Sequence, residues 1–101
     1  MRKTKVVFDS EKLQYSAELM RALAHPLRLK ILEYVDRFDQ INVQKIYKTL
    51  DIEQSITSQH LKILKLSGVL NANKDGKFVY YNINYDVVAR AEMAVNNFLG
   101  K

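Results

Sequence analysis

Hydrophobic residues recur every three or four positions through most of the chain, the spacing that places them on one face of an α-helix. The first segment with this pattern follows Asp9 or Ser10, either of which suits a helix N-cap. Its stripe at positions i, i+4, i+7 and i+11 consists of Leu13, Ala17, Met20 and Ala24. A second stripe widens the apolar arc, so we expect this helix to face both the core and something else.

Three more helices are predicted in the middle of the chain. His25-Pro26 ends the first helix, because proline disfavours α geometry in the residue before it yet suits the first turn of a new helix. The second helix then runs from Pro26 to about Val35. Asn42 is a good N-cap for a short third helix. A fourth runs from about Gln54 to Leu66, with Gly68 placed as its left-handed C-cap, and the short turn before it predicts a helix-turn-helix.

Alternating apolar and polar residues then predict a β-hairpin. Strands from Val69 to Asn73 and from Phe78 to Asn84 flank Lys74-Asp75-Gly76-Lys77, in which Asp-Gly is a typical type I′ turn dipeptide. A final helix, from about Asp86 to Leu99, again carries a broad apolar arc. The sequence therefore predicts one mainly α domain of residues 1–101 with a small β-hairpin, in the order helix, helix, helix-turn-helix, hairpin, helix.

The charge of the chain is localised. Its 101 residues carry a net charge of +5. Residues 1–8 hold three cations and no acid, and residues 45–77 hold six lysines against three acids. Such an excess is typical of a polyanion-binding protein, although a solvated lysine surface is equally compatible with the charge alone. We expect the basic tail, residues 1–9, to be flexible.

Several classes of function are disfavoured by composition. Cysteine is absent, which excludes disulfides, thiolate metal sites and cysteine nucleophiles. No apolar stretch approaches the roughly 18 residues of a membrane span, and the amino terminus lacks an apolar signal core, so we expect a cytoplasmic protein with no membrane partner. The three glycines are scattered, and no nucleophile stands with a base and an orienting carboxylate. We expect neither enzymatic activity nor a cofactor.

The predicted fourth helix has two different faces. On a helical wheel, the packing arc consists of Ile56, Thr57, His60, Leu61, Ile63 and Leu64. The opposite arc is small, polar and cationic without an acid, and consists of Ser55, Ser58, Gln59, Lys62 and Lys65. Glutamine can pair with adenine edges, serine with bases or phosphates, and lysine with phosphates. This arc therefore favours recognition of a DNA major groove over a solvated face, which usually mixes both signs of charge.

Three motifs in this order resemble a known family. They are LAHPLRLKIL at residues 23–32, QSITSQHLKILKLSGVL at 54–70 and GKFVYY at 76–81. Over about residues 13–99 the chain resembles the ArsR/SmtB winged helix-turn-helix transcriptional regulators. The resemblance implies a homodimer, built from the first and last helices, that places two recognition helices in successive major grooves of a pseudo-palindromic operator in double-stranded DNA and represses transcription.

The resemblance also implies roles for single residues. The positions that touch DNA in the family match Gln54, Ser55, Ser58 and Gln59. The predicted DNA-binding set adds His60, Lys62, Lys65 and, from the hairpin wing, Lys74 and Lys77. We expect Thr57 to be core, and His60 to be either a phosphate contact or a buried hydrogen-bonded histidine. The predicted dimer interface consists of Leu13, Ala17, Met20, Val88, Ala91, Val95, Phe98 and Leu99.

The metal-sensing positions of the family are not retained. They are occupied by Tyr85, Val87, Phe98 and Lys101, and the third helix contains no thiolate. We expect no metal site, and we expect His25, which precedes a proline, to be a cap or turn residue. Two alternatives stay open: a winged helix that acts as a protein-interaction module, and a sensor of an unidentified non-metal effector.

Overall fold

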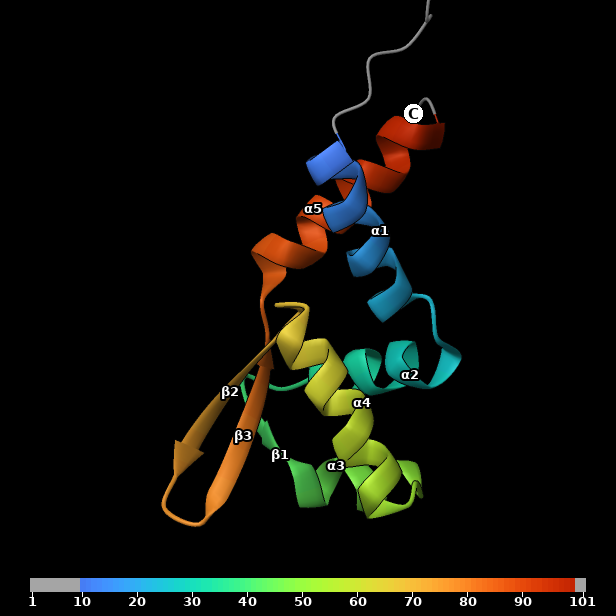
Figure 1. The fold of residues 1–101 in the computed structure, drawn as a ribbon. Coiled ribbons are helices and arrows are strands. Elements are labelled where there is room, and N and C mark those ends of the chain that lie inside the picture. The colour runs from blue at the N-terminus through green and yellow to red at the C-terminus, as the bar shows by residue number, and fades with distance from the viewer. Residues whose placement is uncertain (1–9, 100–101) are drawn as a thin grey trace, which may run out of the picture.

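The computed structural model describes residues 10–99, and the side chains of residues 10–97 (Figure 1). Its helices are α1 (Ser10–Leu23), α2 (Pro26–Val35), α3 (Val43–Leu50), α4 (Gln54–Leu66) and α5 (Tyr85–Leu99). Its strands are β1 (Ile41–Asn42), β2 (Leu70–Asp75) and β3 (Phe78–Ile83). The predicted order of helices and hairpin is confirmed. The tail, residues 1–9, lies outside the described residues.

Local side-chain chemistry explains where the helices begin and end. Nδ1 of His25 accepts a 3.1 Å hydrogen bond from the backbone N–H of Leu27, so this histidine caps α2 as expected. The amide oxygen of Asn42 caps α3 through the N–H of Lys45, at 2.9 Å. Gly68 follows α4 with φ +85°, the left-handed conformation that glycine adopts without a steric penalty.

A third strand joins the predicted hairpin. β1 pairs antiparallel with β3, with Ile41 opposite Tyr81 and Asn42 opposite Tyr80, so the sheet order is β1-β3-β2. The sequence patterns do not predict this strand, because two residues are too few to show an alternation. Its partner lies about forty residues further along the chain, so only the tertiary fold creates it.

The hairpin turn differs from the predicted one. Asp75 pairs with Phe78, which leaves Gly76 and Lys77 as a two-residue loop. Gly76 has φ +61°, and no non-glycine described residue except Asp51 has a positive φ. A positive φ at the first central residue alone is typical of a type II′ turn, whereas type I′ needs it at both. The prediction of a type I′ turn centred on Asp-Gly was therefore wrong, because Asp75 closes the strand ladder.

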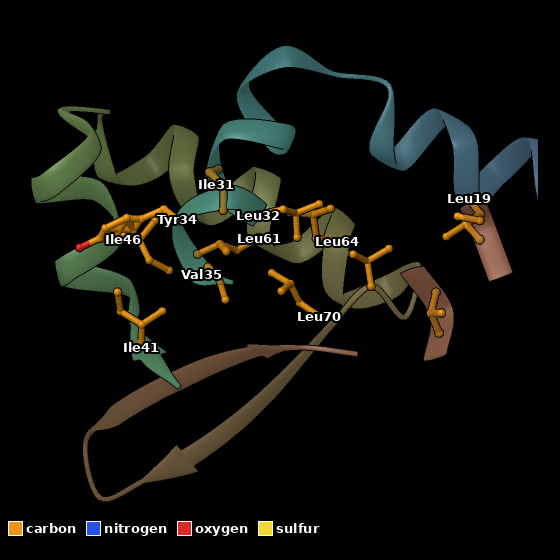
Figure 2. Packing of buried hydrophobic residues seen from close by; sticks show 13 residues of the cluster. Leu19, Ile31, Leu32, Tyr34, Val35, Ile41, Ile46, Leu61, Leu64 and Leu70 are labelled. Atoms are coloured by element: carbon orange, nitrogen blue, oxygen red, sulfur yellow. The ribbon is translucent and has the colours of Figure 1, made fainter. Parts of the chain in front are cut away.

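The hydrophobic core lies where α2, α3 and α4 meet the sheet (Figure 2). The largest side chains that are completely or almost completely buried are Ile31, Val35, Ile46, Leu61, Leu64, Val69 and Leu70. Thr57 is also fully buried, which confirms the expectation that it belongs to the core, and its hydroxyl donates to the backbone oxygen of Glu53 at 3.1 Å. Leu19 of α1 stands apart from this group, beside α5 (Figure 2).

Helices α1 and α5 pack together and project away from the rest of the domain (Figure 1). We call this pair the helical arm, and we call α2, α3, α4 and the sheet the body. The radius of gyration is 16.5 Å, whereas a compact domain of this size has about 13 Å. Only Leu19 and Ala22 of α1 are buried. The arm therefore leaves much of its apolar surface uncovered. Among the described residues, no helix has the length and hydropathy needed to span a bilayer.

Candidate DNA interface

The polar arc of α4 is exposed along its length. The side chains of this arc, together with the first residue of the helix, are all exposed: Gln54, Ser55, Ser58, Gln59, Lys62 and Lys65. No acidic residue lies within α4. The arc therefore presents hydrogen-bonding side chains near the amino end of the helix and two ammonium groups nearer its carboxyl end.

The packing face of α4 is narrower than predicted. Thr57, Leu61 and Leu64 are the buried residues of this helix. Ile56 and Ile63 are each 38% exposed and Leu66 is 77% exposed. The prediction that Ile56 and Ile63 belong to the packing arc was wrong, because the body covers α4 only along the seam of spacing i, i+4 and i+7. Ile56 and Ile63 instead border the polar arc, and Leu66 lies within it at the carboxyl end of the helix.

His60 lies in a cluster of basic side chains. Its Nδ1 accepts a 3.1 Å hydrogen bond from Nε of Arg28, and its ring centroid is 4.7 Å from that of His25. Burial lowers the pKa of His60 below 6.5, and the charges of His25 and Arg28 lower it further. Of the two expected roles, the structure shows the hydrogen-bonded histidine, only partly buried, and the phosphate contact stays a prediction.

The β-hairpin forms the wing, which runs from the carboxyl end of α4 to a turn at the end of the body away from the arm (Figure 1). Lys74 lies in β2 and Lys77 lies in the turn, and both are exposed. Nζ of Lys77 is 5.7 Å from the centroid of the Phe78 ring. Two lysines of the wing are thus exposed in addition to the two on α4.

One hydrogen bond and one backbone conformation set the path of the chain into α4. The hydroxyls of Tyr34 and Thr49 form a 3.0 Å hydrogen bond that joins α2 to α3. Asp51 follows α3 with φ 53°, a left-handed conformation that reverses the chain within three residues. The N-cap residue Glu53 makes no side-chain hydrogen bond to the helix. The first-turn N–H groups of α4 therefore have no side-chain cap from this residue.

The residues predicted for the dimer interface differ in how much of their side chains is exposed. Leu13, Ala17 and Val95 are exposed on the arm, and Met20 and Val88 are partly buried. Ala91 is only 3% exposed and belongs to the core of its own protomer, so it contributes little surface to a partner. Phe98 and Leu99 lie outside the described side chains. Three large exposed hydrophobic residues of the arm are absent from the predicted interface, namely Tyr15, Tyr85 and Met93.

A groove of about 590 Å³ lies between α1, α2 and α5. Its apolar lining includes Met20, Leu23, Leu29, Leu32, Val88 and Val95. Three of these residues also belong to the predicted dimer interface. The groove is therefore continuous with the exposed apolar face of the arm.

Two of the residues at the positions of the family's metal ligands make contacts of a different kind. Tyr85 donates a hydrogen bond to Asp36, and Val87 is buried in the core. Phe98 and Lys101 lie outside the described side chains. Within the described part of the chain, no three His, Asp or Glu side chains gather as a metal site would require. The expected lack of a metal site stays a prediction.

The comparison with known proteins agrees with this geometry. Residues 25–72 match the model of a family described as "Bacterial regulatory protein, arsR family". The transcriptional repressor PagR of Bacillus anthracis is 40% identical over 84 residues, which cover 77% of this chain and 83% of PagR. The chain belongs to the ArsR family. The resemblance seen in the three sequence motifs is thereby confirmed.

Other ArsR-family relatives match in sequence and in structure. The repressor SmtB of Mycobacterium tuberculosis is 40% identical over 73 residues, covering 72% of this chain and 53% of SmtB, so the chain spans about half of that relative. The crystal structure of PagR superposes with a TM-score of 0.71 at 34% identity, over 85% of this chain and 99% of PagR. A homodimeric winged helix-turn-helix domain from Mycobacterium bovis superposes with a TM-score of 0.76 at 24% identity, over 92% and 86% of the two chains. The winged helix fold is confirmed.

Proposed function

We propose that this ArsR-family chain is a sequence-specific DNA-binding repressor that acts as a homodimer on a pseudo-palindromic operator. The observation that carries the proposal is the exposed, acid-free polar arc of α4 beside a lysine-bearing wing. B-form DNA offers a major groove about 12 Å wide, which admits one α-helix. The family is one of regulatory proteins, and PagR and SmtB are named transcriptional repressors.

The side chains of the polar arc and of the wing have different roles in this proposal. Gln54, Ser55, Ser58 and Gln59 read base edges in the major groove. Lys62, Lys65, Lys74 and Lys77 neutralise phosphates, which supplies affinity without sequence information. A winged helix that binds protein instead is disfavoured, because the cores of protein interfaces are depleted in lysine and enriched in aromatic anchors.

The helical arm supports the dimer. A monomer rarely exposes a large continuous apolar face, and here Leu13, Tyr15 and Val95 are exposed on α1 and α5. Val95 also lines the groove between α1, α2 and α5. A second copy placed on a twofold axis would cover this surface with the same surface of its own. The M. bovis neighbour of the same fold is described as homodimeric. No metal is part of the proposal, and an inducing effector stays unidentified.

Selection from a randomised duplex library, followed by fluorescence anisotropy at several salt concentrations, tests the proposal. We expect enrichment of a sequence with two inverted half-sites, and an affinity that falls steeply with salt because bound lysines release counterions from DNA. The exposed lysine on α2, Lys30, lies outside the arc and the wing, so K30A is a suitable control with unchanged affinity. No enrichment, or binding that is insensitive to salt, would favour the protein-interaction module.

A further inference from the structure

One side chain joins the helical arm to the recognition helix. Arg28, in the first turn of α2, donates from Nε to Nδ1 of His60 on α4 at 3.1 Å. Its Nη1 donates to the backbone oxygens of Arg21 and Ala22, each at 3.2 Å. Both of these oxygens lie in the last turn of α1. A single guanidinium carried by α2 therefore contacts two other helices, α1 and α4.

We call these three hydrogen bonds of Arg28 the bridge, and the shape of the guanidinium fixes the directions in which they point. A guanidinium is planar and holds its donors in a fixed fork, so the angle between its two sets of bonds is set by covalent geometry. The carbonyls of a last helical turn have no partner within the helix and carry partial negative charge, which a cation satisfies. Arg28 therefore fixes where α1 ends relative to α2.

The other end of the bridge is equally constrained. Because Nδ1 of His60 accepts a hydrogen bond, the imidazole is neutral and its proton is on Nε2. The ring of His25, which caps α2, packs against it. His60 stands in α4 between Gln59, which belongs to the exposed polar arc, and Leu61, which is fully buried. The bridge therefore relates the polar arc of α4 directly to the end of α1.

We propose that Arg28 is a positioning residue that sets the half-site spacing accepted by the dimer. This inference rests on the proposed function. In a twofold dimer joined through the arm, the relation of α1 to α4 determines both the separation and the angle of the two recognition helices, and a change in one protomer is repeated in the other. Adding one base pair between half-sites moves them apart by about 3.4 Å and rotates one about the DNA axis. A rigid bridge rejects such operators, and a loosened bridge accepts them.

The test uses the selected operator and a series of duplexes with one or two base pairs added or removed between the half-sites. The wild-type protein should bind its preferred spacing at least about tenfold more tightly than its neighbours. R28Q, which removes the charged fork, should bind the whole series within about threefold, and R28K should resemble it because a point charge cannot hold both helices. R37Q, which removes an exposed arginine two residues beyond the other end of α2, should keep the wild-type profile.

Variants of His60 test the same bridge from its other end. H60N keeps an acceptor at the position of Nδ1 and should retain the spacing preference, whereas H60L should lose it. A spacing profile that is unchanged in both R28Q and H60L overturns the inference, whatever the change in overall affinity, because mere destabilisation lowers affinity at every spacing alike. If R28Q does not fold, the comparison of the spacing profiles of H60N and H60L tests the inference instead. A wild-type protein that binds no two-half-site duplex instead contradicts the proposed function itself.

Discussion

The phenol of Tyr85, the first residue of α5, donates a 2.5 Å hydrogen bond to the carboxylate of Asp36, which caps the carboxyl end of α2. This bond attaches the second helix of the arm to the body, as Arg28 attaches the first. It is also the largest cause that raises the pKa of Tyr85 above 10.0, followed by burial and by the charges of Asp36 and Asp39. Two side chains of different chemistry, Arg28 and Tyr85, thus connect the arm to the body through hydrogen bonds.

Stability at alkaline pH should depend on Tyr85. A phenol whose pKa is raised on folding stabilises the folded state fully below pH 10.0, and this stabilisation is lost as the pH rises through the raised pKa. Burial raises the pKa of Tyr81 as well, so it acts in the same direction. Urea denaturation from about pH 8 to 11 should show a smaller decline in the free energy of unfolding for Y85F than for wild type. An equal decline in Y85F, with Y47F as the control at a tyrosine of α3 outside the arm, would contradict this role.

Stability at acidic pH should depend on His60. Its pKa is lowered on folding, so the folded state disfavours the protonated imidazole. The stabilisation is complete above pH 6.5, the ordinary value, and is lost as the pH falls from there toward the lowered pKa. Between about pH 7 and 5, the free energy of unfolding of H60N should therefore fall less than that of wild type. Chemical denaturation at a series of pH values measures this, and parallel curves for the two proteins would exclude it.

Gln59 and Lys62 should contribute to DNA binding in different ways. Removing a bidentate hydrogen-bond partner of a base costs about 1–3 kcal/mol of discrimination, so Q59A should lower the preference for the selected operator over random DNA. K62A should weaken binding to both duplexes alike, and should reduce the slope of log affinity against log salt by about one for each phosphate that the lysine no longer neutralises. Anisotropy titrations with the two duplexes separate these outcomes. A decrease of only non-specific affinity in both variants would show that α4 does not lie in the groove as proposed.

The buried Thr57 should matter through its methyl group more than through its hydroxyl. The carbonyl of Glu53 accepts from both the backbone N–H and the hydroxyl of Thr57, so it keeps one partner in T57V. We expect T57V to change the free energy of unfolding by less than about 1 kcal/mol. T57S deletes a buried methyl group and should destabilise by about 1 kcal/mol or more. Urea denaturation measures both, and a larger decrease for T57V than for T57S would contradict this order.

A charge on the exposed face of the arm should disrupt the dimer. Val95 is 38% exposed and lines the groove between α1, α2 and α5. A glutamate there would be buried without a partner when two copies associate, which is costly. V95E should therefore sediment as a monomer and bind the operator at least about tenfold more weakly, whereas Q40E, at an exposed position outside the arm, should remain a dimer. A dimeric V95E would place the interface elsewhere.

Local patterns in the sequence determined most of the secondary structure. The helices carry strong apolar spacing, and their ends depend on single residues such as His25, Asn42 and Gly68, whose conformations are set by their own chemistry. The polar arc of α4 could also be predicted from the sequence, because an acid-free face depends on composition and helical geometry alone. Family membership followed from motifs that keep their order and spacing.

Only the tertiary structure decided what depends on distant partners. β1 exists because β3 passes beside it, and the exposure of Ile56 and Ile63 follows from how little of α4 the body covers. Ala91 proved to be core rather than part of the free face of the arm, since an apolar helix position does not reveal which neighbour covers it. Arg28 and His60 lie 32 residues apart in sequence, and neither residue alone predicts their hydrogen bond. Periodicity specifies which face of an element is apolar, and packing alone specifies what that face meets.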